Sequence, residues 1–159
     1  MTTILERADL LWNAGRRKEA IQELEDYIPT AIVETSKDDD GQINHSYSSQ
    51  WLPDVINKLR TFHYACAQYA DPATGLKATP EMRIAHLTRI IELGFRFGYI
   101  LKFLAEAHHD LGDDEQARAY MTQAWEVEPN LAGALRISRA LGLSQSKSRL
   151  IRGTRASGL

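Results

Sequence analysis

The segment Gly98-Tyr-Ile-Leu-Lys-Phe-Leu-Ala-Glu-Ala-His-His-Asp-Leu-Gly112 carries the clearest structural pattern of this 159-residue chain. Its apolar residues recur three and four positions apart, which predicts a helix with one apolar face. Gly112 then ends the helix, because glycine adopts the left-handed conformation of a helix terminus at little cost. Residues 113–128 follow with an aspartate cap, a second apolar stripe and a proline just beyond. The segment therefore predicts two short helices joined by a tight glycine turn.

The same order of signals opens the chain, over residues 2–28. An apolar stripe is followed by Gly15 and then by a second stripe. Aligning Gly15 with Gly112 also brings Ala8 onto Ala105, and small residues at such places let two helices approach closely. We therefore expect a second antiparallel helix pair at the N-terminus.

Residues 98–131 resemble the tetratricopeptide repeat, a family of stacked helix pairs. The matching positions are Leu101, Leu104, Ala105, Gly112, Ala117, Met121, Ala124 and Pro129. Residues 2–29 match more loosely, since Tyr27 stands where the family has an alanine and Pro29 comes early. The resemblance implies an all-α fold of about seven helices, in antiparallel pairs that form a short right-handed solenoid.

The spacing of the two glycine turns indicates an irregular middle. Gly15 and Gly112 are 97 residues apart, whereas one intervening repeat of about 34 residues would place them about 68 apart. We expect one helical domain over residues 1–142, followed by a basic tail over 143–159. The expected parts are a helix pair 2–28, an irregular acidic loop 29–50, a helix pair 51–94, a helix pair 98–128 and a capping helix 131–142.

The acidic loop has three interpretations. It is a solvated turn, or a short β-hairpin around Asp40-Gly41 in which residues 31–33 pair with residues 42–44. A calcium loop is disfavoured, because Tyr47 occupies the place of the bidentate glutamate that such loops need.

Several classes of function find no support in the sequence. No apolar run approaches the roughly 20 residues of a membrane-spanning helix, and the N-terminus lacks a signal-like stretch, so we expect a cytoplasmic protein. Cys66 is the sole cysteine, which excludes an internal disulfide. His108 and His109 point about 100° apart on a helix, which disfavours a shared metal ion. No phosphate loop or nucleophile motif occurs, so we expect neither an enzyme nor a cofactor.

The resemblance implies a concave groove lined by the first helix of each pair, which would hold a peptide or helix of another protein. The groove residues would be Glu6, Asp9, Trp12 and Asn13 from the first pair, and Tyr99, Lys102, Phe103, Glu106 and His109 from the last. The alternative is that Trp12 and Phe103 pack against a neighbouring helix. Some members of the family grip a chaperone's C-terminal carboxylate, but Leu5 and Asp9 stand at two of those places, so that function is not expected.

The charge is unevenly distributed along the chain. The net charge is -2, yet residues 1–128 carry -8 and residues 129–159 carry +6. The tail's cationic residues are Lys147, Arg149, Arg152 and Arg155. We expect a protein-binding adaptor, assembly factor or chaperone-like subunit. The alternatives are association with nucleic acid or another anionic surface through the tail, and self-association as a structural subunit.

Overall fold

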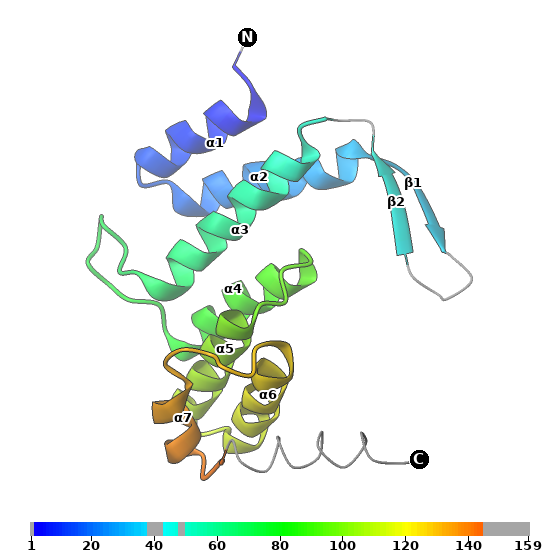
Figure 1. Ribbon diagram of the computed structural model, residues 1–159. Helices are drawn as coiled ribbons and strands as arrows, with labels where there is room; N and C mark the ends of the chain where they lie inside the picture. The colour runs from blue at the N-terminus through cyan, green and yellow to red at the C-terminus, as the bar shows by residue number, and fades with distance from the viewer. Residues whose placement is uncertain (1, 38–42, 48–49, 145–159) are drawn as a thin grey trace, which may run out of the picture. The chain divides into compact units, whose positions relative to one another are not determined.

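The computed structural model describes residues 2–37, 43–47 and 50–144. Within these residues the chain forms seven α-helices and one two-stranded antiparallel hairpin (Figure 1). The helix count and the predominantly helical fold agree with the expectation from sequence.

The chain divides into two compact units. The first unit comprises residues 1–78 and 92–95, and the second comprises residues 79–91 and 96–159. The helices expected over residues 51–94 fall into different units, so that pairing, and the solenoid as a whole, remain predictions.

The first unit is built on three helices, α1 (Ile4–Asn13), α2 (Arg17–Ala31) and α3 (Leu52–Gln68). The turn between α1 and α2 contains Gly15 at a φ of 78°, a left-handed conformation that glycine adopts without strain. Helix α2 packs against both α1 and α3. The antiparallel pair expected at the N-terminus is therefore present.

A capping box starts α1. The backbone N–H of Glu6 donates to the Thr3 hydroxyl at 3.2 Å, and the Thr3 N–H donates to the Glu6 carboxylate at 2.7 Å. The two bonds satisfy donors that the first turn of a helix leaves without intrahelical partners. This geometry sets the start of α1 close to where the sequence predicts it.

Helix α2 runs further than the sequence indicates. We expected it to stop at residue 28, but it continues through Pro29 to Ala31. A proline in the last turn removes only one backbone hydrogen bond, and the Thr30 hydroxyl donates to the Tyr27 carbonyl at 2.7 Å. The expected boundary is corrected by three residues.

The strands β1 (Ile32–Lys37) and β2 (Ile43–Tyr47) follow α2 directly. They pair antiparallel, with Lys37 opposite Ile43 at the distal end and a register irregularity between Ile32 and Glu34. A β-hairpin is therefore present in this segment in place of a wholly irregular loop, but the expected pairing of residues 31–33 with residues 42–44 is wrong. Ile43 and Asn44 pair with Lys37 and Ser36, and Ile32 pairs with Tyr47, because the strands are longer than the sequence indicates. The turn at Asp40-Gly41 lies outside the described residues.

The core of the first unit lies where its three helices meet. Its buried residues are Ala8, Ala20, Leu24, Val55, Leu59 and Phe62. Alanines on α1 and α2 allow close approach, and the leucines of α2 and α3 fill the space between them. Each buried leucine stabilises the fold by roughly 1.5–3 kcal/mol relative to an exposed one.

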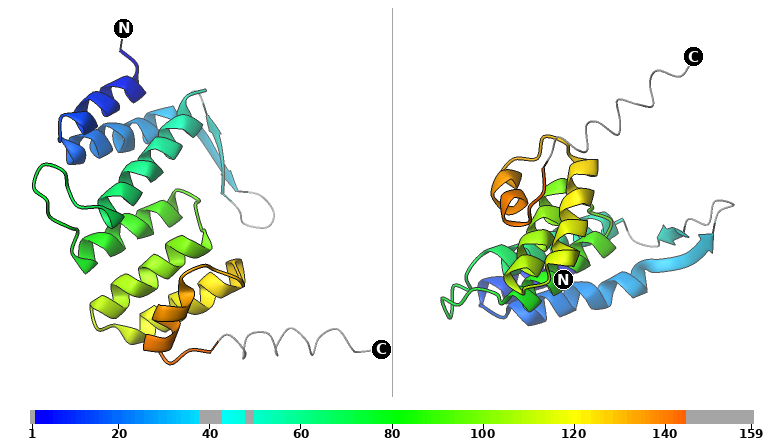
Figure 2. Two further views of the ribbon diagram at one scale, coloured as in Figure 1. Left: turned by 60° about the vertical axis from the view of Figure 1, so that its left-hand side comes forward. Right: turned by 90° about the horizontal axis from the view of Figure 1, so that it is seen from below.

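The second unit contains α4 (Pro80–Glu92), α5 (Gly98–Asp110), α6 (Asp114–Val127) and α7 (Ala134–Ala140). Helices α5 and α6 run side by side as an antiparallel hairpin (Figure 2). Gly112 has a φ of 84° in the turn between them. The pair that the sequence predicts most clearly is present, and α7 is shorter than the expected capping helix.

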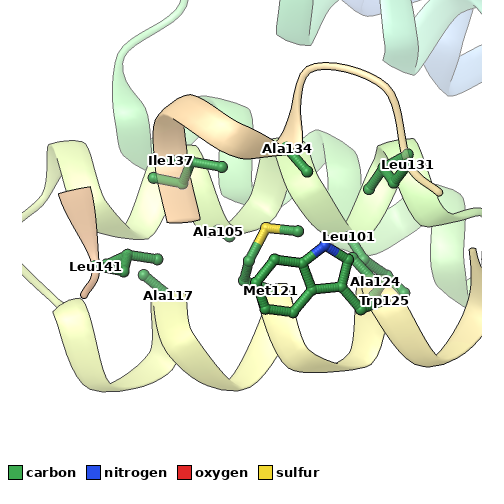
Figure 3. Packing of buried hydrophobic residues seen from close by; sticks show 10 residues of the cluster. All are labelled: Leu101, Ala105, Ala117, Met121, Ala124, Trp125, Leu131, Ala134, Ile137 and Leu141. Carbon is green, nitrogen blue, oxygen red and sulfur yellow. The ribbon is translucent and has the colours of Figure 1, made fainter. Parts of the chain in front are cut away.

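The core of the second unit joins α7 to the α5–α6 hairpin (Figure 3). Its buried residues are Leu101, Ala105, Ala117, Met121, Ala124, Trp125, Leu131, Ala134, Ile137 and Leu141. Because α7 presents Ala134 and Ile137 to the hairpin, it covers apolar surface that would otherwise face solvent.

Candidate functional site

One face of α5 carries five of the residues predicted to bind a partner. Leu101, Leu104 and Ala105 are completely buried on the opposite side, which anchors the helix. The five candidates are all half-buried: Tyr99, Lys102, Phe103, Glu106 and His109. The sequence periodicity therefore separated the buried face of α5 from the remaining faces correctly.

Three aromatic residues, Phe97, Tyr99 and Phe103, form what we call the aromatic trio. The rings of Phe97 and Tyr99 are stacked with centroids 5.6 Å apart, and Phe103 contacts Tyr99 edge to face at 6.3 Å. The Lys102 ammonium lies 4.6 Å from the centre of the Phe103 ring. Phe97 is 42% exposed. The trio thus presents apolar surface beside a positive charge at the N-terminal half of α5.

Sequence reasoning missed Phe97, which caps α5 immediately before its first helical residue. The periodicity of a helix says nothing about a residue just outside it. The available signal was the clustering of Phe97 with Tyr99 and Phe103 in the sequence, since aromatics are frequent in binding hot spots.

A network of charges supports the next turns of α5. Arg83 of α4 contacts Asp110 at 3.1 Å and Glu106 at 3.9 Å, and Lys102 also lies 3.9 Å from Glu106. The side chains of Arg83, Lys102 and Glu106 are only 13–18% exposed. Glu106 therefore links α5 to Arg83 of α4 and also contacts Lys102 one turn earlier on α5, in addition to any role in contacting a partner.

The two adjacent histidines interact with different aspartates. His109 Nδ1 lies 2.6 Å from Asp114 Oδ1, and His108 Nδ1 lies 3.2 Å from Asp113 Oδ2. The His108 ring also stacks on Tyr120, with centroids 5.3 Å apart. Among the described residues there is no group of three or more side chains that could hold a metal ion.

The candidates on α1 are largely engaged within the first unit. Asp9 makes an ion pair of 2.6 Å with Lys58 of α3, and Trp12 stacks on Phe62 of α3 with centroids 4.0 Å apart. The Arg17 guanidinium also lies over the Trp12 ring, 4.6 Å from the ring centre. Trp12 thus packs against a neighbouring helix, as the alternative interpretation held.

The remaining α1 candidates have simpler surroundings. Glu6 closes the capping box of α1, and Asn13 is exposed at the last residue of the helix. Leu10, which sequence reasoning did not select, is 66% exposed. The α1 face therefore offers less preformed contact surface than the aromatic trio of α5.

Cys66 is half-buried in α3, and this burial raises the pKa of its thiol. The thiolate, which is the reactive form, is therefore disfavoured. The four tail cations, Lys147, Arg149, Arg152 and Arg155, lie outside the described residues. In the described parts of the chain, no helix is both long and apolar enough to span a membrane.

Known proteins similar to this chain are found among solved structures. No protein-family model matches the chain, and no curated protein matches it in sequence. Among solved structures it is similar to the C-terminal TPR-containing domain of a Plasmodium falciparum protein assigned to the FK506-binding class. The identity is 16%, the TM-score is 0.48, and the match covers 94% of this chain and 89% of that domain.

Proposed function

We propose that this chain is a non-catalytic protein-binding module that holds a peptide or helix of a partner on the aromatic trio of α5. The observation that supports the proposal is the position of Phe97, Tyr99 and Phe103. Tyr99 contacts both Phe97 and Phe103 and also packs against the core of the second unit, while Leu101, Leu104 and Ala105 of the same helix are completely buried. As an adaptor, assembly factor or chaperone-like subunit, the module would act in the cytoplasm.

A rigid aromatic surface suits this role for a physical reason. Binding costs conformational entropy wherever flexible side chains become ordered. Tyr99 and Phe103 have few rotatable bonds and already restrain each other, so they have little freedom left to lose. Lys102, beside Phe103, adds a charge that favours a partner with an acidic residue next to its apolar contact.

The proposed binding surface extends beyond the aromatic trio. Glu106 and His109 continue the face beyond the trio by two turns, and they would contact the end of a bound helix. Asp9 and Asn13 would contribute from α1. A single groove joining α1 and α5 remains a prediction from the family resemblance.

A site-specific photo-crosslinker tests the proposal. Benzoylphenylalanine replaces Phe103 in one variant and Leu111, which is 45% exposed just after α5, in a control. We expect position 103 to capture a defined protein from native lysate and position 111 not to capture it. Once that protein is purified, a Tyr99→Ala/Phe103→Ala variant should bind it at least about tenfold more weakly, as hot-spot residues do.

Two results would refute the proposal. One is capture of the same proteins at both positions, which indicates non-specific proximity. The other is unchanged affinity of the double variant, with its circular dichroism matching the parent chain. Capture of a second copy of this chain at position 103 would instead support self-association.

A second function, association with an anionic surface such as nucleic acid, is favoured by the separation of charge along the chain. Replacing the four tail cations by glutamine tests it. If the tail binds phosphates, the variant loses binding to a short duplex DNA and the salt dependence flattens. Equal binding of variant and parent excludes this role of the tail.

A further inference from the structure

A cavity of about 530 Å3 lies in the second unit, between the end of α6 and α7. Trp125 of α6 forms part of its lining, and the other walls come from the loop before α7, from α7 itself and from the segment after it. Its apolar walls are Leu131, Ala134, Leu135 and Leu143. The volume is in the range of roughly 300–1,000 Å3 that is usual for ligand sites.

Trp125, which lines this cavity, has a buried hydrogen-bond donor with no acceptor among the described residues. The residue is only 7% exposed, and its indole Nε1–H has no acceptor among the described residues. Figure 3 shows the indole nitrogen turned toward the side of Leu131 and Ala134, which line the cavity. A buried N–H without an acceptor is unfavourable, so a ligand that brings an acceptor gains from contacting it.

One charged side chain lines the described part of the cavity, and it is positive. Arg139 lines it, is exposed, and makes no ion pair with any described residue. Among the described residues, no acidic side chain is in the lining. The cavity therefore complements a group that is apolar, accepts hydrogen bonds and carries negative charge.

We propose that this cavity binds an acidic peptide segment of a partner protein, which inserts one aliphatic side chain between Leu131 and Leu135. A main-chain carbonyl beside that side chain accepts the Trp125 indole N–H, and an acidic neighbour pairs with Arg139. An aliphatic side chain with its adjoining backbone suits a cavity that opens beside Leu135, which is 63% exposed. The proposal does not rest on the function proposed for the aromatic trio.

The charge of the chain's own tail argues against the tail as the occupant. Its apolar residues Leu150 and Ile151 stand between Arg149 and Arg152. Inserting them would bring like charges toward Arg139, which is unfavourable. An acidic segment from a partner gains from the same arginine.

Nuclear magnetic resonance of the indole N–H groups provides a direct test. The full chain contains three tryptophans, so it gives three indole signals, and a Trp125→Phe variant identifies that of Trp125. The probe is a blocked hexapeptide with two central leucines flanked by two acidic residues on each side. Titrated to about 1 mM, a range suited to a peptide that buries one side chain, it should move the Trp125 signal downfield.

Matched peptides and variants define the specificity. A peptide with serines in place of the leucines, and one with lysines in place of the acids, should leave the signal in place. Arg139→Gln should weaken binding by about fivefold or more, as loss of a charge pair does. Arg136→Gln removes a charge from an exposed α7 residue outside the lining and should change the affinity less than twofold.

Three outcomes would overturn the proposal. The first is a Trp125 signal that stays in place with the acidic dileucine peptide. The second is an equal response to the lysine peptide, or an equal loss in Arg136→Gln and Arg139→Gln. The third is a shift of the Trp125 signal in a Leu150→Ser/Ile151→Ser variant without any peptide, which would make the tail the occupant. A Phe103→Ala variant, which leaves Tyr99 and its packing against the core in place, should titrate normally, so the outcomes for the two sites are distinguishable.

Discussion

Replacing Gly98 by alanine adds a methyl group where the start of α5 meets the end of α6. Gly98 is buried, and a Cβ built on it would lie 2.7 Å from the Cβ of Glu128 and 2.8 Å from its Oε2. The carboxylate end of Glu128 can rotate away, because it is exposed. Its Cβ cannot, because it is attached directly to the backbone. The two helix ends must therefore separate.

The size of the effect follows from these distances. Two carbons pack best at about 3.5–4.0 Å, so the contact of 2.7 Å must open by roughly 1 Å. Strain of this kind typically costs about 1–3 kcal/mol. Alanine recovers up to about 1 kcal/mol through its higher helix propensity. We expect Gly98→Ala to lower the free energy of unfolding by roughly 1–2 kcal/mol.

Guanidinium denaturation followed by circular dichroism measures this change, and a double-mutant cycle assigns its cause. Glu128→Gly removes the Cβ that the new methyl group meets. In that background, Gly98→Ala should be neutral or stabilising, with a coupling energy of about 1 kcal/mol or more. The reasoning is refuted if Gly98→Ala stabilises the parent chain, or if it costs the same in both backgrounds.

Three further predictions concern the first unit. Phe62→Ala should lower the free energy of unfolding by about 3–5 kcal/mol, because the ring is 5% exposed and stacks on Trp12. In denaturant melts, a loss below about 1 kcal/mol would contradict this packing. Thr3→Ala should cost about 1 kcal/mol by opening the capping box, whereas Thr2→Ala, outside the box, should be nearly neutral in the same melts. Because burial raises the pKa of the Cys66 thiol, at pH 8 this thiol should react with iodoacetamide more slowly than free cysteine does. The reaction rate should increase as the pH rises or as urea unfolds the chain. A rate in the folded protein equal to that of free cysteine would show that burial does not protect the thiol.

Local signals predicted the parts of the fold that depend on neighbours in sequence. The α5–α6 hairpin followed from an apolar stripe, a glycine at the turn and a second stripe, and Gly112 does have the positive φ that favours glycine. The same logic placed the α1–α2 pair. The end of α2 was misjudged because Pro29 was taken as a stop, whereas it lies in the last turn, where it removes one backbone hydrogen bond and only two helical residues follow it.

The surroundings of the candidate site depended on residues far apart in the sequence. Arg83 reaches Glu106 and Asp110 only because α4 packs beside α5. From the sequence, Trp12 could either contact a partner or pack against a neighbouring helix. The structure shows that it packs, because its ring stacks on Phe62 of α3. A single sequence carries no signal for such pairings, since they arise from which helix faces meet in space.

By itself the sequence determined the helical character of this protein, the glycine turns of its two terminal pairs and the buried face of α5. These features arise from backbone preferences and from apolar spacing within a few turns. Only the tertiary structure decided which polar groups found partners, as with Asp9 and Lys58, and which have none among the described residues, as with the indole N–H of Trp125. The physical reason is that hydrogen bonds and ion pairs act over a few ångströms, so their partners exist only once the helices have packed.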